Sequence, residues 1–249
     1  SQEYDLLEMA ANGNIAIRPG MQGTLTIKHQ NACHIDGSIV WKNGDQSETE
    51  RVAGVLHTDG KLITVLGVGE HADYGTRAYV HAEILGPDLL HWDFVGISDD
   101  KQKGQAFATS FTRSAAVPAH EECPVLIGKW STSHWEGLES TKGGEIERVT
   151  RDYKSLDIEG QSGCTVWGKM HYGARQGEAE GHADRVIGTV NGKDGFVITR
   201  SVAPHPEDGY EAIALSRIQS KNHMITEYSG KLAKAGEAFV YLVDLKRSP

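Results

Sequence analysis

The amino-acid sequence predicts an all-β protein made of two tandem antiparallel units. Each unit is expected to close as an up-and-down β-barrel, with a pair of β-sandwiches as the alternative. The first observation behind this class is alternation of apolar and polar residues over about five to nine positions, between Gly, Asp and Asn residues. Spacing typical of amphipathic helices is nearly absent. The second observation is an internal repeat, in which residues of the first half recur about 130 positions later.

The repeat is clearest where each half ends. The pattern Gly-x-Ala-Phe occurs at Gly104–Phe107 and again at Gly236–Phe239. Other matching positions are Tyr79 with Tyr210, His91 with His223, Trp41 with Trp167, and the tetrapeptide His34–Gly37 with Asp157–Gly160. We therefore expect the two halves to superpose, with Gly104–Phe107 lying on Gly236–Phe239.

The predicted domains are a first β-barrel unit over residues 1–114, a linker over residues 115–124 and a second unit over residues 125–249. The segment Ser114–Pro124 contains two prolines and no alternation, as expected of a linker. Thr58-Asp59-Gly60 and Asn191-Gly192 are typical of hairpin turns. Tyr4–Ala11 and Lys231–Ala235 are the segments expected to hold a helical turn or two.

A short motif at the start of the second unit resembles a known group of barrels. Gly128-Lys129-Trp130 is similar to the Gly-x-Trp start of the lipocalin and avidin (calycin) barrels. Thr150–Tyr153 resembles the second lipocalin motif, and Lys246-Arg247 is similar to the basic residue near the end of those chains. The resemblance implies an up-and-down barrel with this terminal basic residue close to the first-strand Trp. The first unit lacks Gly-x-Trp.

Composition limits the classes of partner. The net charge is −9, with acidic and basic residues interspersed, which argues against a nucleic-acid partner. No apolar run approaches the length of a membrane span, and the first residues do not resemble a secretory signal. Cys33, Cys123 and Cys164 are an odd, sparse set, which argues against a disulfide framework and favours a reducing compartment. Cys33 and Cys164 are expected to be small buried thiols. We therefore expect a cytoplasmic protein without nucleic-acid or membrane partners. The composition is compatible with a homo-oligomer.

Histidines beside aromatic residues are the main chemical signal, and the chain has twelve histidines. In His91-Trp92-Asp93 and His134-Trp135-Glu136, alternation places the histidine and the carboxylate on one face of a strand and the Trp on the other. A carboxylate beside a histidine can fix its tautomer and raise its basicity. The alternative is a solvated polar face whose Trp packs inward.

The second unit is expected to carry the site. Trp167, Lys169 and His171 share one strand face, which predicts an aromatic wall, a cation and a general base. The catalytic candidates are His171, His134 and Lys169, and the substrate-binding candidates are Trp135, Trp167, Arg200, Tyr228, Trp41 and His91. The polar loop Gly173–His182 is a candidate lid. The alternative is a site in the first unit, around His34, Trp41, His81 and His91.

The predicted function is a cofactor-independent acid–base enzyme, of isomerase, cyclase or lyase type, acting on a small hydrophobic or aromatic molecule in a barrel pocket. A non-catalytic carrier or sensor of such a ligand is the alternative, and an interaction module is a third class. No metal is expected, because His-x-His, His-Glu-x-x-His and Cys-x-x-Cys are absent. No cofactor is expected either. Gly67–Ala72 mimics a dinucleotide fingerprint but lacks the surrounding βαβ unit.

Overall fold

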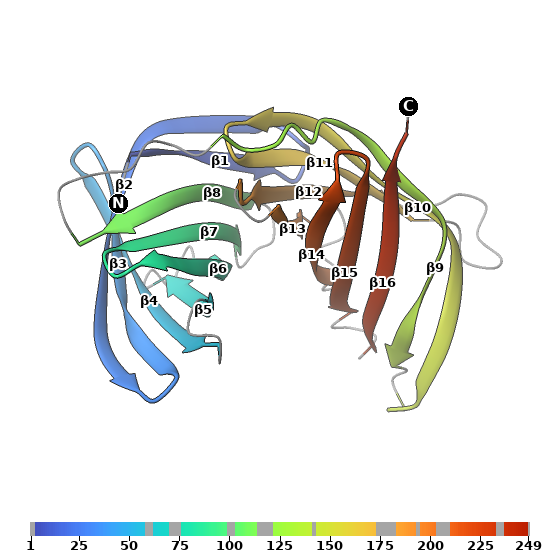
Figure 1. Cartoon of the computed structure of the whole chain (residues 1–249), viewed down its shortest axis with the longest axis horizontal. Helices are drawn as coiled ribbons and strands as arrows, with labels where there is room; N and C mark the ends of the chain where they lie inside the picture. Colours follow the sequence, from blue (N-terminus) through green and yellow to red (C-terminus); the bar gives the residue numbers. More distant parts are fainter. Residues whose placement is uncertain are drawn as a thin grey trace. The chain divides into compact units, whose positions relative to one another are not determined.

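The computed structural model describes ten stretches of the chain (Figure 1). They are residues 3–57, 62–69, 76–98, 103–113, 122–140, 143–172, 183–192, 195–202, 210–232 and 237–248. These stretches contain sixteen β-strands and no helix. The predicted all-β class is confirmed.

The strands form two closed barrels, each with its strands in sequence order and its neighbours antiparallel. Barrel 1 closes where β1 pairs with β8, and barrel 2 closes where β16 pairs with β9. Barrel 1 consists of β1 (Tyr4–Ala10), β2 (Ile15–Asn31), β3 (His34–Asn43), β4 (Gln46–Leu56), β5 (Leu62–Gly69), β6 (Thr76–Gly86), β7 (Leu89–Ser98) and β8 (Lys103–Thr112). Barrel 2 consists of β9 (Gly128–Ser140), β10 (Ile146–Ser162), β11 (Thr165–Tyr172), β12 (Ala183–Val190), β13 (Phe196–Val202), β14 (Tyr210–Ser220), β15 (His223–Leu232) and β16 (Glu237–Arg247). This is the predicted pair of up-and-down barrels rather than a pair of sandwiches.

The chain divides into two compact units, one of residues 1–10 with 14–121 and the other of residues 11–13 with 122–249. Most of the predicted linker, residues 115–124, lies outside the described residues, as does the candidate lid Gly173–His182.

The internal repeat corresponds to equivalent strands at most of its matching positions. Phe107 lies on β8 and Phe239 on β16, the eighth strand of each barrel. Tyr79 and Tyr210 lie on sixth strands, His91 and His223 on seventh strands, and Trp41 and Trp167 on third strands. The tetrapeptide match is wrong, because His34–Gly37 begins the third strand of its barrel whereas Asp157–Gly160 lies on the second strand of the other.

The helical turn expected at Tyr4–Ala11 is also wrong, because Tyr4–Ala10 is strand β1. This strand pairs with β2 on one side and β8 on the other, and Tyr4 and Leu6 point into the core of barrel 1. Pairing on both sides outweighs the helix preference of Leu, Glu, Met and Ala. The other expected turn is wrong at its described part, since Lys231 and Leu232 belong to β15.

The two barrel interiors are packed differently. Aromatic rings dominate the core of barrel 1, which contains Tyr4, Trp41, Trp92, Phe94, Phe107 and Phe111. Barrel 2 combines aliphatic side chains with Trp130, Trp135, Tyr228 and Tyr241. Eight strands enclose an interior that side chains nearly fill, so each barrel has a packed core rather than a channel.

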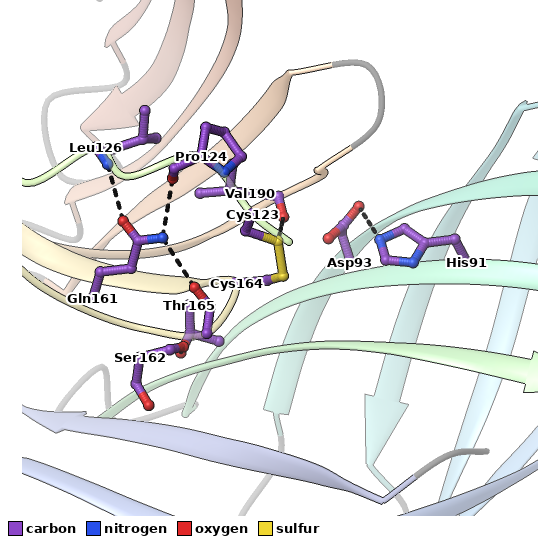
Figure 2. The surroundings of a disulfide bond; sticks show 11 residues. His91, Asp93, Cys123, Pro124, Leu126, Gln161, Ser162, Cys164, Thr165 and Val190 are labelled. Carbon is purple, nitrogen blue, oxygen red and sulfur yellow. Dashed lines mark hydrogen bonds and ion pairs between the residues drawn. A yellow bond between two sulfur atoms is a disulfide. The ribbon is translucent and has the colours of Figure 1, made fainter. Parts of the chain in front are cut away.

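A strap of residues 122–127 leads into barrel 2 and is tied to it (Figure 2). Cys123 forms a disulfide with Cys164, and their Cα atoms lie 5.3 Å apart. The Gln161 side chain donates a hydrogen bond to Pro124 O and accepts one from Leu126 N, both at 3.0 Å. Leu126 is buried in the core of barrel 2.

The disulfide corrects the prediction that the cysteines form no disulfide and that Cys164 is a buried thiol. Cys123 and Cys164 are 41 positions apart in sequence, and their proximity depends on the path of the strap, which no local pattern reveals. The remaining thiol, Cys33, is exposed rather than buried. The cysteine count therefore gives no support to a reducing compartment.

The contact implied by the calycin resemblance is present. Trp130 is fully buried, and its indole nitrogen donates a hydrogen bond to Leu126 O at 2.9 Å. The guanidinium carbon of Arg247 lies 5.4 Å from the centre of the Trp130 ring, and Arg247 also donates a hydrogen bond to Ile127 O. Trp130 is thus a core residue that fixes the strap at the start of β9.

Removing the disulfide should destabilise barrel 2. The double variant Cys123→Ser/Cys164→Ser is expected to lower the free energy of unfolding by about 3–4 kcal/mol, because the cross-link limits the unfolded chain. Urea unfolding under oxidising conditions measures the change. The control Cys33→Ser replaces the exposed thiol and should leave the midpoint unchanged. Equal midpoints for the double variant and the wild type would contradict a stabilising role.

Candidate functional site

The strand face shared by Trp167, Lys169 and His171 is the outer face of barrel 2. The alternate residues of β11 point inward, and two of them, Val166 and Met170, are buried in the core. The three side chains share a face, as predicted, but they point out of the barrel rather than into it. The prediction that they line a pocket inside barrel 2 is therefore wrong.

On this outer face, His171 and Lys169 form ion pairs with carboxylates of the adjacent strand β10. His171 Nε2 lies 3.3 Å from Asp157 Oδ2, and Lys169 Nζ lies 2.8 Å from Glu159 Oε1. About a third of each of these four side chains is exposed. Ion pairs at such exposure contribute little to stability.

Three other candidates are placed as follows. His91 Nε2 lies 3.3 Å from Asp93 Oδ2 (Figure 2), so the predicted histidine–carboxylate pair exists. It points away from the barrel 1 core that Trp92 and Phe94 enter. Arg200 likewise lies on β13 on the face opposite to Val197, which is in the core of barrel 2. The side chain of His134 lies outside the described residues.

Two candidates of barrel 2 do meet inside it, around a residue that the sequence analysis missed. Lys154 is fully buried, and its Nζ lies 3.4 Å from the centre of the Tyr228 ring and 4.5 Å from that of Trp135. Tyr241 completes this aromatic cage at 5.8 Å. Burial lowers the pKa of Lys154 well below its usual value, and the negative charge of Asp184 acts in the opposite direction.

Barrel 1 also encloses a titratable group. Trp41, a substrate-binding candidate, is buried there and donates a hydrogen bond from Nε1 to Glu50 Oε2 at 2.9 Å. Burial raises the pKa of Glu50 to about 7, although this hydrogen bond lowers it and the charge of Glu48 raises it. Burial also raises the pKa of Tyr4 above its usual value, with a further contribution from Glu50.

An apolar cup of about 620 Å³ opens at one end of barrel 1. The strands β3, β4, β6, β7 and β8 begin or end there. Its apolar lining includes Leu25, Val52, Leu56, Ile84, Leu90, Trp92 and Phe111. Trp92 and Phe111 belong both to the cup and to the aromatic core, with their rings edge to face at 5.6 Å. Gln30, Asp88 and Arg113 supply polar groups at the cup.

Glu50 and Lys154 could have been noticed in the sequence. Each is a charged residue in an alternating series whose other members are apolar, as in Glu50-x-Val52 and Lys154-x-Leu156-x-Ile158. Alternation places such a charge in the interior together with its apolar neighbours. The cup had no such signal, because its lining comes from six strands spread over residues 23–113.

Two absences hold within the described stretches alone. No three His, Cys, Asp or Glu side chains are grouped there in a way that could hold a metal ion. Nor do those stretches contain a helix long and apolar enough to span a membrane.

Comparison with known proteins gives no family. No family model matches the chain, and neither does any curated protein. A solved structure similar to it is that of a protein of unknown function from the DUF3598 family of Nostoc punctiforme PCC 73102. The TM-score is 0.41 at 9% identity, over 99% of this chain and 94% of that one. Likeness at this level carries no argument about ligand or activity.

Glu50 should make stability depend on pH in a defined window. Its pKa is about 7 in the folded protein and 4.5 in its unperturbed state, so between these values the folded chain binds more protons than the unfolded chain. The free energy of unfolding should therefore fall by about 3 kcal/mol as the pH rises through this window. Glu50→Gln removes the titrating group and should abolish that fall.

Urea unfolding at several pH values between 4.5 and 7.5, followed by Trp fluorescence, measures this dependence. Asp45→Asn, at an exposed turn position of the same barrel, is the matched control and should keep the wild-type slope. A wild-type slope in Glu50→Gln would show that burial of Glu50 has no net effect on its pKa.

Proposed function

We propose that the protein binds a small apolar molecule in the cup of barrel 1, as a carrier or sensor. The observation that supports this function best is the cup itself, whose apolar wall is built from six strands and which opens at one end. A cavity of about 620 Å³ is within the usual size of small-molecule sites, and such sites are mostly apolar with a few polar groups.

The lining indicates the kind of ligand. Leu56, Ile84 and Leu90 are partly buried and pack against the core, so they offer apolar surface that a ligand can cover. Trp92 and Phe111 also line the cup, so a ligand there would meet two aromatic side chains. Arg113 and Asp88 can hydrogen-bond to one polar end of the ligand. The expected ligand is therefore mainly hydrocarbon or aromatic, with at most one polar group.

Acid–base catalysis on such a ligand is the second candidate, and Glu50 is the observation that favours it. A carboxyl group with a pKa of about 7 has a value suited to a general base at neutral pH. Glu50 and Val52 point to the same side of β4 about 7 Å apart, and Val52 lines the cup. Glu50 itself does not line the cup, so a ligand bound there would not touch the carboxyl group. Ligand binding is therefore the first candidate function and catalysis the second. Loss of turnover in Glu50→Gln, with ligand affinity kept, would support this second candidate.

We also propose that barrel 2 is related to the calycin barrels. Gly128-Lys129-Trp130 begins its first strand, and Arg247 lies over the Trp130 ring. The eight-stranded up-and-down topology is the one that this group uses.

Substitution in the cup should reduce binding of a neutral apolar probe, N-phenyl-1-naphthylamine. Leu56→Asp places a carboxylate against the bound probe and should weaken its affinity at least tenfold, because an unpaired charge resists loss of water. Val55→Asp changes the adjacent residue of β4, which is 45% exposed and points outward, and should leave affinity unchanged. A fluorescence titration measures both. Equal affinities in the two variants would place the probe outside the cup.

A further inference from the structure

The aromatic cage around Lys154 is not part of the cup, and two of its rings, Trp135 and Tyr241, line a groove on barrel 2. The groove lies at an irregularity in the wall of barrel 2. The β16–β9 ladder pairs Leu242 with Glu136 and resumes where Lys246 pairs with Ser131. Between these two pairs β16 advances four positions and β9 advances five, so β9 carries a β-bulge.

The bulge explains how two Trp residues enter the same core. Trp130 and Trp135 are both buried in barrel 2 although five positions separate them. Strict alternation would place two residues at an odd separation on opposite faces. The extra residue restores both rings to the interior.

A groove of about 840 Å³ lies on barrel 2 at the bulge. Ser131, Thr132 and Ser133 line it from β9, and Leu242 and Asp244 line it from β16. Trp135 and Tyr241 line the groove as well, and the same two rings belong to the cage around Lys154. Their rings contact each other edge to face at 4.0 Å. The groove therefore reaches the aromatic wall behind which the amine lies.

The groove also has an apolar border. Leu138, Val240 and Leu242 are each more than half exposed, and all three line it. Side chains of this size are usually buried, and together they offer a surface on which an apolar molecule can first bind.

We propose that Lys154 is a covalent binding site for a small aromatic aldehyde or ketone, which enters through the groove at the β9 bulge. The cage supplies flat apolar surface for the aromatic part of the ligand, and the amine supplies the nucleophile. This site is independent of the cup, so its failure would leave the proposed function of barrel 1 untouched.

The reaction is an imine condensation. The neutral Nζ attacks the carbonyl carbon, the carbonyl oxygen takes up a proton, and the resulting carbinolamine loses water as the C=N bond forms. No electrons are exchanged with an external oxidant or reductant. The nucleophile must be a neutral amine. Burial lowers the pKa of Lys154 and so favours its neutral form. Asp184, whose charge acts on Lys154, can receive and return the proton.

The test is reductive trapping of the native protein with benzaldehyde and sodium cyanoborohydride at pH 7, followed by peptide mass spectrometry. Lys154 is expected to gain a benzyl group at least tenfold faster than the partly exposed Lys169. Its rate should rise only slightly when the pH is raised from 7 to 9, because burial already favours the neutral form of this amine. Labelling of Lys154 no faster than Lys169 would overturn the proposal.

Two variants separate the amine from its access route. Lys154→Met removes the nucleophile while keeping an unbranched side chain, and the fast label should disappear. Ser133→Trp fills the groove from an exposed position of β9 and should slow labelling of Lys154 several-fold. Gln219→Trp, at an exposed position of β14, is its matched control and should keep the wild-type rate. Equal rates in Ser133→Trp and Gln219→Trp would overturn the proposed entry.

Discussion

Closure of each eight-stranded sheet is the constraint on which the rest of the structure depends. When the last strand pairs with the first, the backbone hydrogen bonds of both edges are satisfied and alternate side chains must share a narrow interior. An interior of that size has room for a packed core and little else. Function then depends on the places where the core leaves space or where the wall is irregular. The cup of barrel 1 is the first kind of place, and the β9 bulge of barrel 2 is the second.

Each barrel also encloses an ionisable group among aromatic rings. Glu50 accepts a hydrogen bond from Trp41, and Lys154 lies over the face of Tyr228. Burying a charge is unfavourable, and burial shifts the pKa of each group toward its neutral form. An apolar residue of similar size would avoid that cost. We therefore propose acid–base chemistry at Glu50 and nucleophilic chemistry at Lys154.

Much of the fold could be predicted from sequence, because alternation and turn residues report strand existence directly. The match of His91 with His223 and of Tyr79 with Tyr210 also identified equivalent strands. It was harder to predict which face of a strand points into the barrel. Trp167, Lys169 and His171 share a face, but choosing the inner one requires weighing Val166 and Met170 on the other side. The β9 bulge and the Cys123–Cys164 disulfide depend on pairing between distant segments, which no local pattern encodes.

We propose above all that a small molecule binds in the apolar cup of barrel 1. Intermolecular nuclear Overhauser effects between bound N-phenyl-1-naphthylamine and methyl-labelled protein test it most directly, because they report contact at individual side chains. Binding in the cup predicts contacts from the probe to the methyl groups of Leu56, Ile84 and Leu90, and none to the outward-facing Val55. Contacts confined to exposed methyl groups such as those of Val55 and Val240, with none to the cup, would contradict it.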